Sequence, residues 1–75
     1  MTYKEFALII KEKRLDLEIK QKDISYKLGI SLSKYSKIEN GVMEPNFFEL
    51  TMLFDILDID PSILKIKKSK IHFFD

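Results

Sequence analysis

Residues 21–41 constrain the fold more than any other stretch, because they contain two short helical patterns separated by a glycine. Apolar residues recur three or four positions apart on each side of that glycine, as Ile24 and Leu28 before it and Tyr35 and Ile38 after it. This spacing is typical of one face of an α-helix. Gly29 can adopt the left-handed conformation that ends the first helix, and Ser31 can accept hydrogen bonds from the free N–H groups that begin the second. Two helices joined by such a short turn form a helix-turn-helix.

The length and composition allow one small domain. The chain has 75 residues, so we expect a single core that is marginal unless its helices pack efficiently or a second subunit contributes buried area. The absence of cysteine excludes disulfides, thiolate metal sites and cysteine nucleophiles. The longest apolar run near the N-terminus, residues 6–10, is too short for a signal peptide or a membrane span. We therefore expect a soluble, cytoplasmic protein.

The charges are segregated along the chain, although the total is only +1. Residues 1–19 have no net charge, and residues 20–37 have a net charge of +4. Residues 38–64 have a net charge of −6, and residues 65–75 have a net charge of +3. A basic region confined to the helix-turn-helix suits a surface that faces phosphates. A charged face that is merely solvated is the alternative, and charge alone does not separate the two.

The first predicted helix begins after Thr2, which forms a capping-box pattern with Glu5. One stripe of this helix follows at spacings of three and four residues: Phe6, Ile10, Arg14 and Leu17. If the arginine on this apolar stripe is buried, it needs a charged partner, because a lone buried charge costs several kcal/mol. If it is not buried, its side chain extends to solvent, and the spacing alone leaves both alternatives open.

A further helix is predicted after Asn46, which stands three residues before Glu49 as an N-cap. Its apolar residues occupy more than one face: Phe47, Leu50, Leu53, Phe54 and Leu57 on one, and Phe48, Met52 and Ile56 on the next. Helices of this kind are buried on several sides. Asp60 and Pro61 then predict a short fifth helix over residues 62–66. The remaining residues have no helical period, so we expect them to be extended, frayed or paired with a neighbouring subunit.

The sequence contains no pattern of catalytic or metal-binding residues. The single histidine, His72, has no second histidine or cysteine with which to share a metal or form a triad. The acidic residues at positions 55, 58 and 60 lack the central glycine of a calcium loop, so a solvated helix face is the better interpretation. Two glycines are too few for a glycine-rich phosphate loop. We therefore expect a binding protein, with no enzyme activity, no cofactor and no small-molecule substrate.

Six residues between positions 6 and 64 stand at a spacing that is known from one family: Arg14, Gln21, Gly29, Glu39, Gly41 and Pro45. In this register the chain resembles the Cro/repressor type of helix-turn-helix, the lambda-repressor-like fold. Two positions depart from the family pattern. Glu18 stands where the family usually has glycine, and Lys20 stands where it usually has a serine or threonine N-cap. Both departures affect the turn between the first two helices and not the surface that would read DNA.

The resemblance implies a compact, all-α, five-helix domain over residues 1–66. The helix-turn-helix proper would occupy residues 21–39, and residues 67–75 would form a C-terminal tail, either a short extended segment or part of a dimer contact. The resemblance also implies a structural ion pair between Arg14 and Glu39, because the matching arginine and glutamate usually pair in the family. Fork geometry makes such a pairing reasonable between an arginine and a carboxylate.

The function that the resemblance implies is sequence-specific binding to double-stranded DNA. In a helix-turn-helix, residues near the start of the second helix meet base edges in the major groove. On this chain the base-reading candidates are Leu32, Ser33, Ser36 and Lys37. The phosphate-contacting candidates lie at and around the two helices: Gln21, Lys34, Asn40, Lys20 and Lys22.

A homodimer on a two-fold operator is expected, because one recognition helix spans too few base pairs to define a unique site. Apolar residues place the expected interface at the C-terminal end: Ile63, Leu64, Ile66, Phe73 and Phe74. A transcription regulator of bacterial, phage or plasmid type is the first hypothesis. The second is an antitoxin-like or anti-repressor module that uses the same fold to hold another protein. Salt-dependent DNA affinity concentrated on the second helix of the motif would favour the first.

Overall fold

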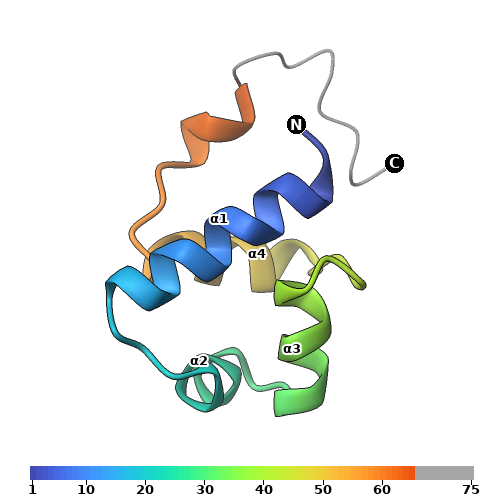
Figure 1. Cartoon of the computed structure of the whole chain (residues 1–75), viewed down its shortest axis with the longest axis vertical. Helices are drawn as coiled ribbons and strands as arrows, with labels where there is room; N and C mark the ends of the chain where they lie inside the picture. Colours follow the sequence, from blue (N-terminus) through green and yellow to red (C-terminus); the bar gives the residue numbers. More distant parts are fainter. Residues whose placement is uncertain (66–75) are drawn as a thin grey trace.

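Residues 1–65 form four α-helices and one 3-10 helix (Figure 1). A computed structural model of the chain describes residues 1–65, which form the elements α1 (Tyr3–Asp16), α2 (Gln21–Leu28), α3 (Leu32–Glu39), α4 (Phe47–Ile56) and the 3-10 helix η1 (Pro61–Lys65). Within these residues there is no strand, which confirms the predicted all-α class. The expectations for Ile66, for Phe73 and Phe74, and for an extended tail fall outside the described residues.

Short polar side chains cap the starts of α1, α3 and α4, as the sequence predicted. The Thr2 hydroxyl accepts a hydrogen bond from the Glu5 N–H at 3.2 Å, and the Glu5 carboxylate accepts one from the Thr2 N–H at 2.6 Å. The reciprocal arrangement recurs at the start of α4 between Asn46 and Glu49, at 2.8 and 2.9 Å. At α3, Ser31 accepts a hydrogen bond from the third N–H of the helix at 3.0 Å. These contacts satisfy N–H groups that have no partner within their own helix.

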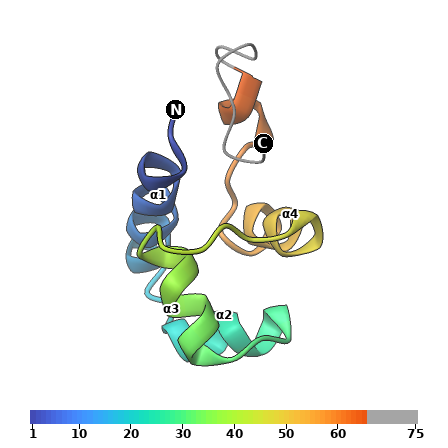
Figure 2. The same ribbon diagram turned by 90° about the vertical axis from the view of Figure 1, so that its right-hand side faces the viewer.

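One apolar core lies between the four α-helices. Its buried apolar side chains are Tyr3, Phe6, Ala7, Ile10, Ile24, Leu28, Tyr35, Ile38, Leu50, Leu53, Phe54, Leu57 and Ile59. In both views α2 and α3 lie at one end of the molecule and η1 lies at the opposite end (Figures 1 and 2). Ile63 and Leu64 of η1 are partly buried against the core.

The prediction that the fourth helix is buried on several sides is wrong. Phe47 is 71% exposed and Phe48 is 75% exposed, and their rings contact each other edge to face. The two residues lie in the first turn of α4, at the end of that helix that is farther from α1 (Figure 2). Leu17 is also exposed, because α1 ends at Asp16 and the chain turns there. The apolar spacing in the sequence therefore included side chains that no other helix covers within residues 1–65.

The segment Pro61–Lys65 is a 3-10 helix, where the sequence predicted a short fifth helix over residues 62–66. The Ile63 N–H donates to the Asp60 carbonyl at 3.1 Å, a bond that spans three residues rather than four. A five-residue segment is too short to gain much from the α-helical hydrogen-bond pattern, and 3-10 turns are common in pieces of this length.

Glu18 occupies the left-handed backbone region, with φ of +57°. The Ile19 N–H donates to the Arg14 carbonyl at 3.1 Å, so the chain closes the end of α1 by the kind of turn that normally has glycine at this position. A side chain in this region is strained, and glycine is not. The departure from the family pattern at Glu18 therefore changes the residue but not the turn.

Replacing Glu18 with Gly is expected to raise the free energy of unfolding by about 0.5–1 kcal/mol, because relief of the left-handed strain exceeds the extra flexibility that glycine gives the unfolded chain. Urea denaturation measures the change. Glu12→Gly is the matched control, since Glu12 is exposed within α1, and it is expected to lower stability by about 1 kcal/mol. A loss of stability in both variants would show that the Glu18 side chain stabilises the turn.

Candidate nucleic-acid interface

The four base-reading candidates lie on one outward side of α3. Leu32, Ser33 and Lys37 are exposed, and Ser36 is half-buried. The opposite side of α3 packs into the core through Tyr35 and Ile38, which are fully buried. Helical spacing produces this division, since positions one, two, five and six of the helix share a face. The core therefore fixes the orientation of α3 and leaves its first turn open.

The turn that leads into α3 has the geometry of a helix-turn-helix. Gly29 has φ of +71° and ends α2 in the left-handed conformation. Its N–H donates to the Tyr26 carbonyl at 3.1 Å, and the next N–H, of Ile30, donates to the Ser25 carbonyl at 3.0 Å. Ser25 keeps its own hydroxyl satisfied by donating to the Lys22 carbonyl at 2.8 Å. Lys20 precedes α2 without capping it through its side chain.

Three of the phosphate-contacting candidates are exposed, and the other two donate to carboxylates within the protein. Lys20, Lys22 and Asn40 are exposed, and the Asn40 amide donates to the Ser36 hydroxyl at 3.4 Å. The Gln21 amide donates to the Glu39 carboxylate at 3.0 Å. The Lys34 ammonium donates to the Glu49 carboxylate at 2.9 Å. The last two contacts were not expected from the sequence, which assigned both side chains to phosphates.

A buried ion pair joins α1 to α3 behind the exposed face. Arg14 donates from Nε to Glu39 Oε2 at 2.7 Å and from Nη2 to Oε1 at 2.9 Å. Its remaining nitrogen, Nη1, donates to the Ile19 carbonyl at 2.9 Å. The Glu39 side chain is only 1% exposed. This is the fork-to-fork arrangement in which arginine binds a carboxylate most strongly.

Glu39 has further donors on α2 and α3. The Tyr35 hydroxyl donates to Glu39 Oε2 at 2.6 Å, and the Gln21 amide donates to Oε1 at 3.0 Å. The sequence pattern placed Tyr35 with Ile38 on the apolar face of the helix, and its position four residues before Glu39 also places Tyr35 and Glu39 on one face. Among the described residues no buried side-chain nitrogen or oxygen lacks a hydrogen-bond partner. One carboxylate thus ties α1, α2 and α3 together.

The contacts of Glu39 shift the pKa values of the groups around it. Burial raises the pKa of the Glu39 carboxyl, but the hydrogen bonds from Arg14, Tyr35 and Gln21 outweigh burial, and the net shift is downward. The hydrogen bond to Glu39 raises the pKa of Arg14. Burial, followed by the hydrogen bond to Glu39, raises the pKa of Tyr35. At neutral pH the pair is therefore charged and the tyrosine hydroxyl remains a donor.

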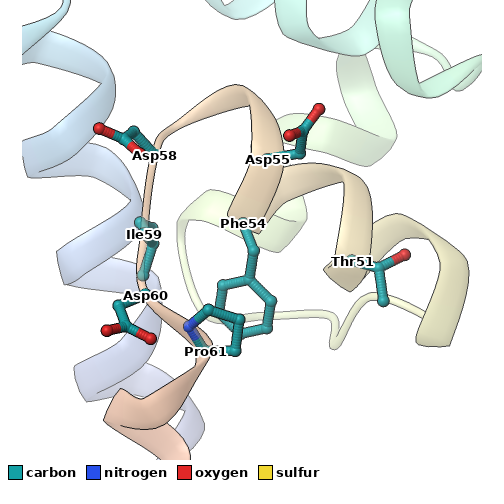
Figure 3. Close-up of a pocket in the computed structure, with 7 residues that line it drawn as sticks. All are labelled: Thr51, Phe54, Asp55, Asp58, Ile59, Asp60 and Pro61. Atoms are coloured by element: carbon teal, nitrogen blue, oxygen red, sulfur yellow. The ribbon is translucent and has the colours of Figure 1, made fainter.

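A hollow lies between α4 and η1. The rings of Phe54 and Pro61 line it, and the carboxylates of Asp55, Asp58 and Asp60 point in different directions at its edge (Figure 3). No group of three potential metal ligands occurs in the described part of the chain. In residues 1–65 no helix is both long and apolar enough to cross a membrane.

Comparisons with known proteins point to one kind of domain. A family model described as helix-turn-helix matches residues 10–64. The chain is also 29% identical over 68 residues to the ImmF control region 10 kDa protein of Bacillus phage phi105, and the alignment covers 91% of this chain and 76% of the phage protein. No solved structure matches the chain significantly.

Replacing Glu39 with Ala is expected to lower the free energy of unfolding by about 3 kcal/mol or more at neutral pH, because Arg14 is left buried and unpaired. The difference from the unsubstituted protein should shrink as the solution is acidified. The folded-state pKa of Glu39 lies below its unfolded value, so its stabilisation is complete above the unfolded pKa and is lost as pH falls through the folded pKa. Urea denaturation at a series of pH values measures both effects.

Glu12→Ala removes an exposed carboxylate from α1 and serves as the control. We expect it to change stability by less than about 0.5 kcal/mol. If the two variants were equally stable, Arg14 would be solvated and the ion pair would contribute nothing.

Proposed function

The chain belongs to the Cro/repressor-type helix-turn-helix family, and we propose that it is a sequence-specific, DNA-binding regulator of transcription. The observation that carries this proposal is the first turn of α3, which is exposed on one side and fixed by the core on the other. The printed name of its phage relative refers to a control region, which supports a regulatory role. Such a protein would act in the cytoplasm, where bacterial, phage and plasmid operators are found.

We assign base reading to the outward side chains of α3, with the helix lying in the major groove. Lys37 can donate to guanine O6 and N7, and the Leu32 side chain suits a thymine methyl group. Ser33 and Ser36 can donate to or accept from several bases, so each specifies less on its own. The exposure of Leu32, Ser33 and Lys37 supports the assignment, and Ser36 is half-buried on the same side of α3.

Phosphate contacts would come from the residues that flank this face. Lys20 and Lys22 are exposed at the start of α2, and Asn40 is exposed at the end of α3. Gln21 lies at the N-terminus of α2, where backbone N–H groups also favour anions. Its bond to Glu39 holds the amide in one orientation, which would reduce the entropy lost on binding.

Replacing Leu32 or Ser33 with Ala is expected to change which bases are preferred, at a cost of about 1–3 kcal/mol on the site selected by the unsubstituted protein. Lys22→Ala should weaken selected and unselected sites nearly equally, because a phosphate contact has no sequence information. Selection from a randomised duplex library, followed by affinity measurements, tests both. If affinity and base preference were unchanged in all three variants, this face would not bind DNA and a protein-holding role would take its place.

We also propose that the protein binds a two-fold operator as a homodimer. Half-sites one duplex turn apart, about 34 Å, require a self-association surface. Ile63 and Leu64 are only partly buried on η1, at the opposite end of the molecule from α2 and α3 (Figure 1). The sequence continues this apolar character at Ile66, Phe73 and Phe74. In a symmetric interface there, each substitution would be present on both sides of the contact.

Replacing Ile63 with Asp is expected to give a monomer with much weaker operator binding, because a charge would be placed in the shared apolar surface. Sedimentation measures the oligomeric state, and a thermal melt shows whether the variant is folded. Leu15→Asp places the same charge on an exposed apolar residue of α1 and should leave the dimer intact. Unsubstituted protein that is monomeric at high micromolar concentration, with one copy bound per operator, would contradict the dimer.

A further inference from the structure

Lys34 is a cation beside the reading face that has an anionic partner within the protein. It is the third residue of α3, and its Nζ lies 2.9 Å from Glu49 Oε2 on α4. A positive charge in the first turn of a helix is unfavourable to the helix dipole. A lysine at this position therefore does not stabilise α3 through the helix dipole. The contact instead joins the first turn of the proposed reading helix to the first turn of α4.

Glu49 is held in place independently of Lys34. Its Oε1 accepts from the Asn46 N–H at 2.9 Å, while its own N–H donates to the Asn46 side chain at 2.8 Å. The Glu49 side chain is 8% exposed, whereas that of Lys34 is 38% exposed. Burial raises the pKa of Glu49, but the hydrogen bonds from Lys34 and Asn46 give a net downward shift, so the carboxylate is charged at neutral pH. The carboxylate is thus held in place by Asn46, and the ammonium is the more exposed partner of the pair.

A phosphate that recruited Lys34 would have to compete with this carboxylate. Moving the ammonium away would leave a nearly buried negative charge with the Asn46 N–H and without its cation, which is unfavourable. The negative charge of Glu49 would also lie close to the phosphate. Lysines that contact phosphates release condensed cations from DNA, and this release produces the salt dependence of binding. A lysine already neutralised by a carboxylate contributes little to that release.

We propose that Glu49 is a specificity-determining residue, which pairs with Lys34 beside the reading face and so removes one lysine from sequence-independent attraction to phosphates. The inference rests on the proposed function, since it concerns the DNA surface formed by α3. Lys20, Lys22, Lys27 and Lys37 remain exposed in and beside the helix-turn-helix, and they would provide the remaining attraction to phosphates. The pair lowers affinity for non-cognate DNA while leaving the base-reading side chains unchanged, and therefore raises discrimination between sites.

A double-substitution cycle with Glu49→Gln and Lys34→Met tests the proposal on the full chain. Glutamine keeps an oxygen that can accept from the Asn46 N–H, so the capping arrangement is retained without the charge. Binding to a random-sequence duplex is measured over a series of salt concentrations for the unsubstituted protein, both single variants and the double variant. Glu49→Gln should bind this duplex more tightly, and the slope of log affinity against log salt should steepen by about 0.9. Thermal melts identify any variant that is not folded.

Lys34→Met is the decisive variant, because it removes the cation from a partly exposed side chain. It leaves Glu49 without that cation, so the thermal melt must show that the variant is folded before its slope is compared. On the unsubstituted background it should leave the slope nearly unchanged, and on the Glu49→Gln background it should reduce the slope by about 0.9. Lys22→Met is the control and should reduce the slope on either background. A reduction of about 0.9 caused by Lys34→Met alone would overturn the proposal, because Lys34 would then be a phosphate contact despite its partner. An unsubstituted protein with no salt-dependent DNA binding would overturn the proposed function as well.

Discussion

The buried ion pair between Arg14 and Glu39 is the contact on which the arrangement of the first three helices depends. Glu39 accepts hydrogen bonds from Arg14 on α1, from Gln21 on α2 and from Tyr35 on α3. A carboxylate with so little exposure is tolerable only because every one of these donors is present. The network lies directly behind the first turn of α2 and the last turn of α3. It therefore fixes the two helices that would meet DNA relative to the helix that supports them.

A second polar contact fixes the other end of α3. Lys34 and Glu49 join the start of α3 to the start of α4, so each end of the proposed reading helix has an ionic attachment to another helix. The two attachments differ in kind. The pair at Glu39 is buried on both sides, whereas Lys34 is partly exposed and can respond to an approaching phosphate. One contact sets the position of the helix, and the other would set how strongly its surroundings attract DNA.

Local patterns in the sequence predicted most of the fold, and contacts between distant residues account for most of what they missed. The bounds of α2 and α3 follow from Gly29 and Ser31, because each acts on backbone groups within a few residues. The exposure of Phe47 and Phe48 could not be predicted from their helical spacing. Spacing shows which residues share a face of a helix, but it does not show whether another helix packs against that face. Contacts such as Lys34 to Glu49 and Gln21 to Glu39 depend on how three helices meet, so charge and spacing along one helix do not reveal them. Glu39 could be predicted as the partner of Arg14 only through the family resemblance.

The most direct test of the account is a titration of the isotope-labelled chain with a random-sequence duplex at low salt, followed by backbone amide resonances. Phosphate contacts dominate such binding and need no knowledge of the operator. The account predicts that the largest shifts occur at the start of α2, across residues 31–37 and at Asn40, that they diminish as salt is added, and that amides around Leu8 and Leu15 on α1 change little. Shifts concentrated on α1 or η1, or no shift at low salt, would contradict it.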